Sequence, residues 1–222
     1  MSRSNVFDLL GPVMVGPSSS HTAGAVRLGE MARKILGEEP IAGTIILHGS
    51  FAETGKGHGT NMALIAGLLG MTPDDERIPE APLLAKELGK NFIFETADLG
   101  EVHPNTVKFE LTGLKGNVTV VGSSIGGGTV VVREINNFQV EIRGDYSALV
   151  ILHRDLPGVV AQVTLLLATA QINIARMRVS REKKGAQALM VLETDQVIDE
   201  TVLVLLQRLP NIHQALAIEP LE

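Results

Sequence analysis

The last part of the chain carries the pattern that most restricts its fold, because short apolar segments alternate there with two helical segments. Runs rich in Val, Ile and Leu are typical of strands, and apolar residues three and four apart are typical of helices. Pro157 stands in the first turn of the first helical segment, where proline is tolerated. The expected elements are strands at 148–153, 172–180, 188–193 and 212–218 and helices at about 157–169 and 199–209. The order βαββαβ predicts a ferredoxin-like unit.

The residues before Gly144 predict a different architecture, because both helical and strand periods occur there. A buried strand is expected at 41–48, and helices are expected after Thr22 and after Thr60. From Val107 onward the period is two, which is typical of half-buried antiparallel strands. The sequence therefore predicts an α+β chain. We expect a mixed helix and antiparallel-sheet domain over residues 1–144 and the ferredoxin-like domain over residues 145–222.

A polar cluster stands at the start of the first helix, where Gly-Pro-Ser-Ser-Ser-His-Thr covers residues 16–22. Backbone N–H groups, the positive end of the helix dipole and the hydroxyls of Ser18, Ser19 and Ser20 converge there, which suits a carboxylate or phosphate. His21 adds a group that exchanges a proton near neutral pH. A serine before a helix is most often only a cap worth about 1 kcal/mol. One serine suffices to cap a helix, and this segment has three. A plain cap and a ligand site are therefore both possible interpretations.

A second polar segment, residues 49–60, follows the buried strand and is rich in glycine. Its glycines alternate around Lys56 and His58, so the backbone there can approach a ligand closely. The spacing is not that of a nucleotide-binding loop, because Lys56 is followed by glycine instead of Ser or Thr. A functional loop is the favoured interpretation, and a flexible surface loop is the alternative.

Composition excludes several classes of function. The formal net charge is −6, only 3% of residues are aromatic and there is no Trp, so nucleic-acid and anionic-membrane partners are disfavoured. No signal peptide and no apolar run long enough to span a bilayer is expected, which predicts a cytoplasmic location. The chain has no cysteine, so it offers no disulfide and no thiolate for a metal. We expect no metal site in this chain, and any iron–sulfur chemistry must come from a partner.

Four motifs resemble the beta chain of iron–sulfur-dependent L-serine dehydratase. They lie at residues 11–25, 49–60, 103–106 and 124–128. The resemblance implies a lyase that converts L-serine to pyruvate and ammonia. It also implies a separate alpha chain that binds a 4Fe–4S cluster through cysteines, which agrees with the lack of cysteine here. The first domain is similar to the allosteric substrate-binding domain of some phosphoglycerate dehydrogenases.

The second domain resembles an ACT domain, since the turn Asp155-Leu156-Pro157-Gly158 between its first strand and first helix matches that family's ligand loop. Asp155 and Gly158 are therefore the expected ligand-loop residues. Such domains usually bind an amino acid at the interface of a paired copy. The resemblance thus implies a homodimer contact through this domain.

The resemblance also assigns roles to residues of the first domain. Dehydration of serine needs a base for the α-proton, and His58 is the first candidate. His21 is the second candidate and would polarise a substrate oxygen. The residues expected to bind substrate are Ser18, Ser19, Ser20, Thr22, Lys56, His103 and Asn105, of which the last two resemble a loop that faces the catalytic domain.

Two other classes of function compete with a catalytic subunit. A non-catalytic, amino-acid-sensing regulatory protein would bind serine without turning it over. A dinucleotide-dependent dehydrogenase is disfavoured, because no strand–GxGxxG–helix unit is present.

Overall fold

The computed structural model describes residues 13–16, 18–54 and 59–221. The chain divides into two compact units, one that ends at Asn136 and one that covers Asn137–Leu221. Our boundary after residue 144 stays a prediction, because this division counts the strand β6 (Phe138–Ile142) with the second unit.

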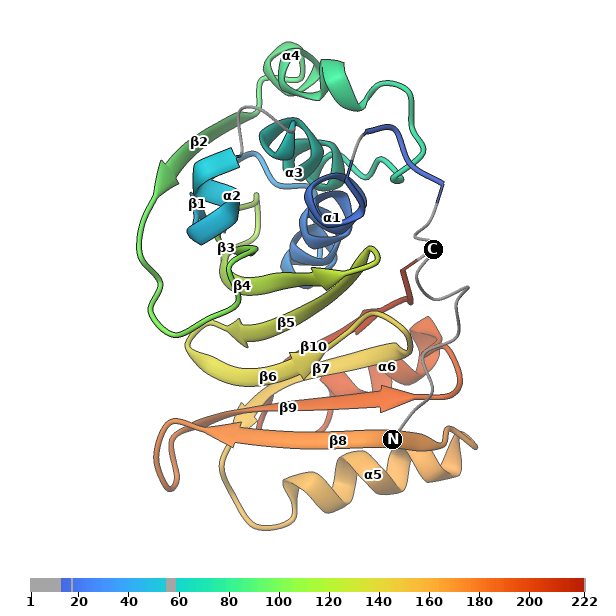
Figure 1. Ribbon diagram of the computed structural model, residues 1–222. Helices are drawn as coiled ribbons and strands as arrows, with labels where there is room; N and C mark the ends of the chain where they lie inside the picture. The colour runs from blue at the N-terminus through green and yellow to red at the C-terminus, as the bar shows by residue number, and fades with distance from the viewer. Residues whose placement is uncertain (1–12, 17, 55–58, 222) are drawn as a thin grey trace, which may run out of the picture. The chain divides into compact units, whose positions relative to one another are not determined.

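A mixed sheet organises the first unit. Its strands are β1 (Ala42–Leu47), β2 (Asn91–Thr96), β3 (Thr106–Thr112), β4 (Asn117–Gly126) and β5 (Thr129–Ile135). They follow the hydrogen-bonding order β2-β1-β3-β4-β5, and Figure 1 shows helices lying against this sheet. The sequence pattern predicts antiparallel pairing, which holds for β1 with β3, whereas β1 and β2 are parallel. The sequence pattern does not predict strand β2, because β2 is an edge strand whose residues are all at least partly exposed.

The longest helix of the first unit starts in the serine cluster. A π-helical turn, η2 (Ser19–Ala23), runs directly into α1 (Gly24–Leu36), and Gly37 ends α1 with a left-handed φ of 77°. The others are α2 (Gly49–Thr54), α3 (Thr60–Leu68), η3 (Ile78–Glu80) and α4 (Ala81–Glu87). The expectation of a loop over all of residues 49–60 is therefore wrong for its first half, which is α2.

Helices α1 and α3 cross at two glycines, and Figure 1 shows the pair side by side. A Cβ at Gly29 would collide with the Leu64 carbonyl oxygen, and a Cβ at Gly67 would collide with that of Val26. Only glycine permits this backbone approach, which packs the second half of α3 against α1. None of the helices that the structure describes is long and apolar enough to cross a membrane.

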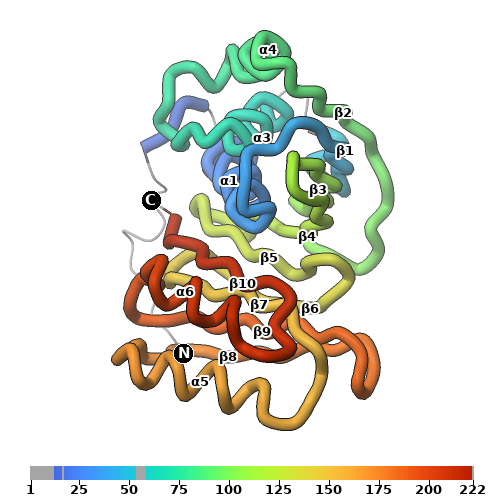
Figure 2. Tube along the Cα trace, turned by 180° about the vertical axis from the view of Figure 1, so that it is seen from behind, coloured from blue at the N-terminus to red at the C-terminus, as the bar shows by residue number. Residues whose placement is uncertain are grey.

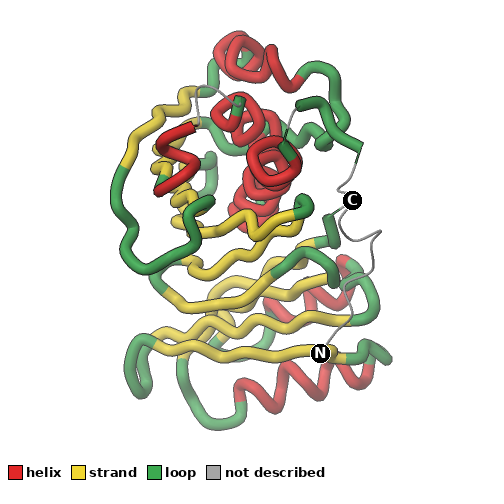
Figure 3. Tube along the Cα trace, in the orientation of Figure 1, coloured by secondary structure: helices red, strands yellow, loops and turns green. Residues whose placement is uncertain are grey.

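The second unit has the predicted βαββαβ order. Its elements after β6 are β7 (Ser147–Arg154), α5 (Val159–Thr169), β8 (Ile174–Arg181), β9 (Gln187–Thr194), α6 (Glu200–Gln207) and β10 (Ile212–Ile218). The sheet order is β10-β7-β9-β8, which confirms the ferredoxin-like topology and the α+β class. Figure 2, from behind, and Figure 3, coloured by element type, show α5 and α6 on one face of this sheet.

The core of the second unit lies between its helices and that sheet face. Val163 and Leu167 of α5 meet Leu206 of α6 over Ile151 and Leu192 of the strands. Asp199 is the cap of α6, because its carboxylate accepts a hydrogen bond from the Val202 N–H at 2.8 Å. The opposite face of the sheet is therefore formed by the residues that alternate with this core.

Candidate functional site

The helix start in the first unit is built around Ser18. Ser18 has an extended backbone (φ −141°, ψ 122°), and its Oγ accepts a hydrogen bond from the His21 N–H at 3.2 Å. Its carbonyl accepts one from the Thr22 N–H at 2.8 Å. The N–H groups of Ser19 and Ser20 lie in the first turn, where no earlier helix carbonyl can take them. The structure thus makes Ser18 the cap and places Ser19 and Ser20, both half-buried, at the helix end.

His21 is held between two hydroxyls from distant parts of the chain. Its Nδ1 lies 3.3 Å from Ser18 Oγ, and its Nε2 lies 3.2 Å from Ser50 Oγ. The buried ring of Phe51 meets the imidazole edge-on, with centroids 5.3 Å apart and an interplanar angle of 70°. A neutral imidazole donates from one nitrogen and accepts at the other, so this chain of groups can hold or pass a proton. Prediction from the sequence missed Ser50, because only the fold brings α2 to the helix start.

The corner at residues 103–106 adjoins the same helix α2. The Pro104 carbonyl accepts a hydrogen bond from the Ser50 N–H at 2.9 Å, and Gly49 beside it needs its left-handed φ of 51°. His103 is exposed, and its Nδ1 accepts from the Asn105 N–H at 3.1 Å. The structure therefore brings this corner next to Ser50, and through Ser50 to His21.

Three buried hydroxyls on contacting elements have no hydrogen-bond partner among the described residues. They belong to Thr22 in η2, Thr60 at the start of α3 and Ser124 in β4. The elements α3 and β4 both contact η2, and the Ser124 hydroxyl occupies the space that a Cβ on Gly24 would need. A buried hydroxyl without a partner costs free energy, so such groups are retained where a ligand or water can satisfy them. The sequence predicts Thr22 as a residue of the site, but it does not predict Thr60 or Ser124.

Two expected residues of the site cannot be placed. Lys56 and His58, the substrate-binding lysine and the first candidate for the base, lie outside the described residues. Their roles stay predictions. No group of three or more His, Cys, Asp or Glu side chains suited to a metal ion occurs within the described parts of the chain.

The expected ligand loop of the second unit is tied to a neighbouring turn. The Asp155 carboxylate accepts hydrogen bonds from the Gly185 N–H and from the Arg181 guanidinium, each at 3.2 Å. The Gly185 N–H, with Arg181 beside it, lowers the pKa of Asp155 below its usual value. Gly158 has a left-handed φ of 93° at the start of α5, which a side chain would strain. These contacts hold the loop in place, and ligand binding there stays a prediction.

The fold and these sites define a two-unit protein in which a polar, hydroxyl-rich helix start precedes an ACT-type unit. Residues 147–211 match the ACT domain family, and residues 5–91 match the family described as the serine dehydratase beta chain. The chain is 45% identical to the probable L-serine dehydratase beta chain of Bacillus subtilis, over 96% of this chain and 97% of that one. It is 40% identical to the L-serine dehydratase beta chain of Peptoniphilus asaccharolyticus, over 91% and 92%. The chain belongs to the serine dehydratase beta-chain family.

A more distant relative has a different activity. The D-3-phosphoglycerate dehydrogenase of Synechocystis sp. is 26% identical over 88% of this chain, which corresponds to 35% of that enzyme. Both units of the present chain therefore have a counterpart within part of a larger dehydrogenase. This agrees with the similarity expected from the sequence.

Proposed function

We propose that this chain is the beta subunit of an L-serine dehydratase, an ammonia-lyase that converts L-serine to pyruvate and ammonia. The observation that carries the proposal is His21, held between Ser18 and Ser50 at a helix start. Dehydration removes the α-proton and the β-hydroxyl of serine, so it needs a carboxylate anchor and a proton-exchanging group. The family relationship adds L-serine as the substrate.

Within this site, each group of residues has a distinct task. The N–H groups and hydroxyls of Ser19 and Ser20 bind the serine carboxylate at the positive end of the helix. His21 exchanges a proton with a substrate oxygen while Ser18 and Ser50 orient its ring. His58 takes the α-proton. The hydroxyls of Thr22, Thr60 and Ser124 line the buried side of the helix start and complete its polar environment.

The family implies a 4Fe–4S cluster, and the residues of this chain do not fit one. Such clusters are held mainly by cysteine thiolates, and this chain has no cysteine. We propose that an alpha chain holds the cluster and that the beta chain supplies substrate-binding groups. The purified beta chain should then contain no stoichiometric iron or sulfide.

Reconstitution with the alpha chain tests the proposal. The beta chain, the alpha chain and their mixture are each incubated anaerobically with L-serine, and pyruvate is measured. We expect pyruvate only from the mixture, with each single chain serving as the control for the other. If the beta chain binds L-serine tightly while the mixture makes no pyruvate, the chain is a regulatory sensor instead.

We propose further that the second unit pairs with a second copy of itself. Strand β8 is at the edge of its sheet, and edge strands offer unpaired backbone groups to another chain. Exposed apolar side chains lie on β8 and α5: Met177 is 47% exposed, Val179 42% and Leu165 69%. Burial of these side chains would favour association.

Light scattering of the full chain tests this pairing. We expect a dimer that Val179→Lys shifts toward monomer, because the variant places a charge in the apolar contact. Val197→Lys adds the same charge at another exposed valine of this unit and should leave the mass unchanged. A monomeric wild-type chain, or a dimer equally sensitive to both variants, contradicts pairing through β8.

A further inference from the structure

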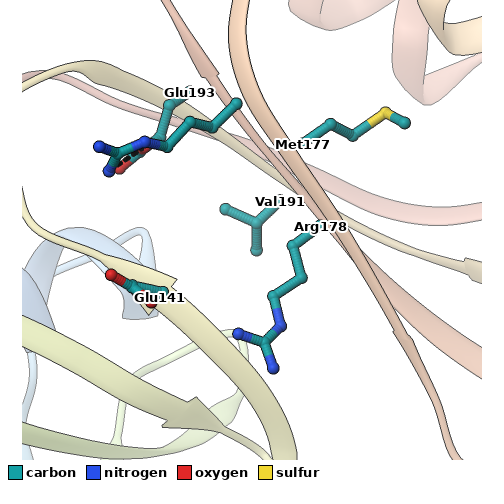
Figure 4. A pocket seen from close by; sticks show the side chains of 6 residues that line it. Glu141, Met177, Arg178, Val191 and Glu193 are labelled. Atoms are coloured by element: carbon teal, nitrogen blue, oxygen red, sulfur yellow. Dashed lines mark hydrogen bonds and ion pairs between the residues drawn. The ribbon is translucent and has the colours of Figure 1, made fainter.

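A cavity of about 370 Å³ lies within the second unit, away from the residues expected to bind a ligand there. It is lined by Glu141 of β6, by Arg176, Met177 and Arg178 of β8, and by Val191 and Glu193 of β9. Figure 4 shows Glu141 across the space from Val191 and Arg178. This volume is at the lower end for ligand pockets, so it suits a small metabolite.

Strand register explains why charged residues gather here. Arg176 pairs with Glu193, and Arg178 pairs with Val191, so each arginine lies beside its cross-strand neighbour on one face. Val191 and Glu193 alternate with Met190 and Leu192, which belong to the core under the helices. The cavity therefore lies on the face of the sheet opposite to α5 and α6.

Both carboxylates of the cavity are already engaged by arginines. Glu193, whose side chain is only 3% exposed, lies 3.4 Å from Arg176. Glu141 accepts hydrogen bonds from Arg143 at 2.9 and 3.2 Å. Arg178 differs, because its guanidinium has no hydrogen-bond or ion-pair partner among the described residues. Arg178 is therefore the charged side chain of this lining that has no partner among the described residues.

We propose that this cavity binds a small monocarboxylate, with Arg178 as the anchor for the carboxylate and Val191 in contact with its short apolar part. A guanidinium matches a carboxylate with two parallel hydrogen bonds, and one free guanidinium matches one negative charge. An amino acid would add an ammonium group, which needs a free carboxylate. Glu141 and Glu193 are both engaged, so the cavity discriminates against zwitterions of the same size.

Propionate and L-alanine form a matched pair of probes, because they differ only in the α-ammonium group. Binding of each to the full-length chain is measured by ligand-detected nuclear magnetic resonance and by calorimetry. The variants are Arg178→Gln, which removes the anchor, and Arg178→Lys, which keeps the charge but not the paired hydrogen bonds. Arg208→Gln removes the same charge from an exposed position at the end of α6 and is the control.

We expect propionate to bind the wild-type chain and L-alanine to bind more weakly at this cavity. Arg178→Gln should weaken propionate by about 10- to 150-fold, as for the loss of a charge-assisted hydrogen bond, with a smaller loss for Arg178→Lys. Arg208→Gln should leave propionate affinity unchanged. The proposal fails if propionate does not bind, if Arg178→Gln binds it as well as the wild type does, or if L-alanine binds with equal or higher affinity through Arg178.

Discussion

The helix start of the first unit and the cavity of the second unit offer opposite means of binding the ligands that we propose for them. At the helix start, backbone N–H groups, hydroxyls and the His21 ring converge, and the hydrogen bonds described for His21 join it to the hydroxyls of Ser18 and Ser50. In the cavity, arginines and glutamates pair with one another, and Arg178 remains for a ligand. Neutral N–H and O–H groups can bind an anion with little loss of their own solvation energy. Paired charges lose much more solvation energy on burial, and their mutual attraction must first offset that loss.

This difference predicts how ligand binding at each site depends on salt concentration. Fixed dipoles and hydrogen bonds in a half-buried site are screened little by salt, whereas exposed charges such as Arg178 are screened strongly. The helix start therefore suits a substrate that must be oriented for chemistry. The cavity suits a ligand whose bound fraction changes with salt concentration.

The largest expected effect in this comparison comes from removing His58, the proposed base of the first unit. In the assembled enzyme, His58→Ala should lower turnover by about 10²- to 10⁴-fold, the usual contribution of a general base. The measurement is pyruvate formation at saturating serine, with iron content and subunit association checked in parallel.

His213→Ala is the control for that experiment, because His213 is an exposed histidine of β10 in the second unit. It should leave turnover unchanged. A loss below about fivefold in His58→Ala, well short of a general-base contribution, would assign the base to His21 instead.

The next effect concerns substrate affinity at the helix start. Ser19→Ala or Ser20→Ala should weaken L-serine by about 10- to 150-fold, because a charge-assisted hydrogen bond to the carboxylate is lost. Melting temperature should change little, since the helix cap is Ser18. Titration of the assembled enzyme measures the affinity. Unchanged affinity in both variants would remove the contrast with the cavity and leave this stretch a plain helix start.

The helix start could be predicted from the sequence because its residues are contiguous. The hydroxyls and His21 stand next to one another, and a helical period follows them directly. The βαββαβ order was equally accessible, since each strand and helix carries its own local pattern and Asp199 marks a helix cap. Local signals of this kind need no knowledge of tertiary contacts.

The remaining features depend on contacts between distant segments. Ser50 lies 29 positions from His21 and joins it only because α2 forms in a segment that looks like a glycine-rich loop. The cavity depends on the register between β8 and β9, since a shift of β8 by one residue would turn Arg178 to the helix side. No single stretch of the sequence contains either signal.

A smaller effect separates the cap from the ligand-binding serines. Ser18→Ala should lower stability by about 1 kcal/mol, because the His21 N–H loses the oxygen that accepts its hydrogen bond. Ser18→Asp keeps an acceptor at the cap and should restore most of the loss. Thermal melting of the three chains measures this. If Ser18→Ala melts like the wild type, the cap lies elsewhere and the assignment of Ser19 and Ser20 to the ligand loses its basis.

The smallest expected effect concerns the buried carboxylate of the cavity. Burial raises the pKa of Glu193 above its ordinary value of 4.5, although Arg176 acts in the opposite direction. The folded chain therefore holds this proton more tightly than the unfolded chain does. The resulting stability is fully present below pH 4.5 and is lost as pH rises through the folded-state pKa.

The Gln side chain of the Glu193→Gln variant cannot ionise. As pH rises from about 4 toward 7, the melting temperature of this variant should therefore rise relative to that of the wild type, which is the direction that linkage requires. Glu182→Gln makes the same charge change at an exposed position in the β8–β9 turn and is the control. The difference between wild type and Glu193→Gln, measured against that control, isolates the buried group. A difference that moves in favour of the wild type as pH rises would mean that the ion pair with Arg176 outweighs burial. The two sites would then differ less than their structures indicate, because the paired charges of the cavity would stabilise the fold instead of costing it stability.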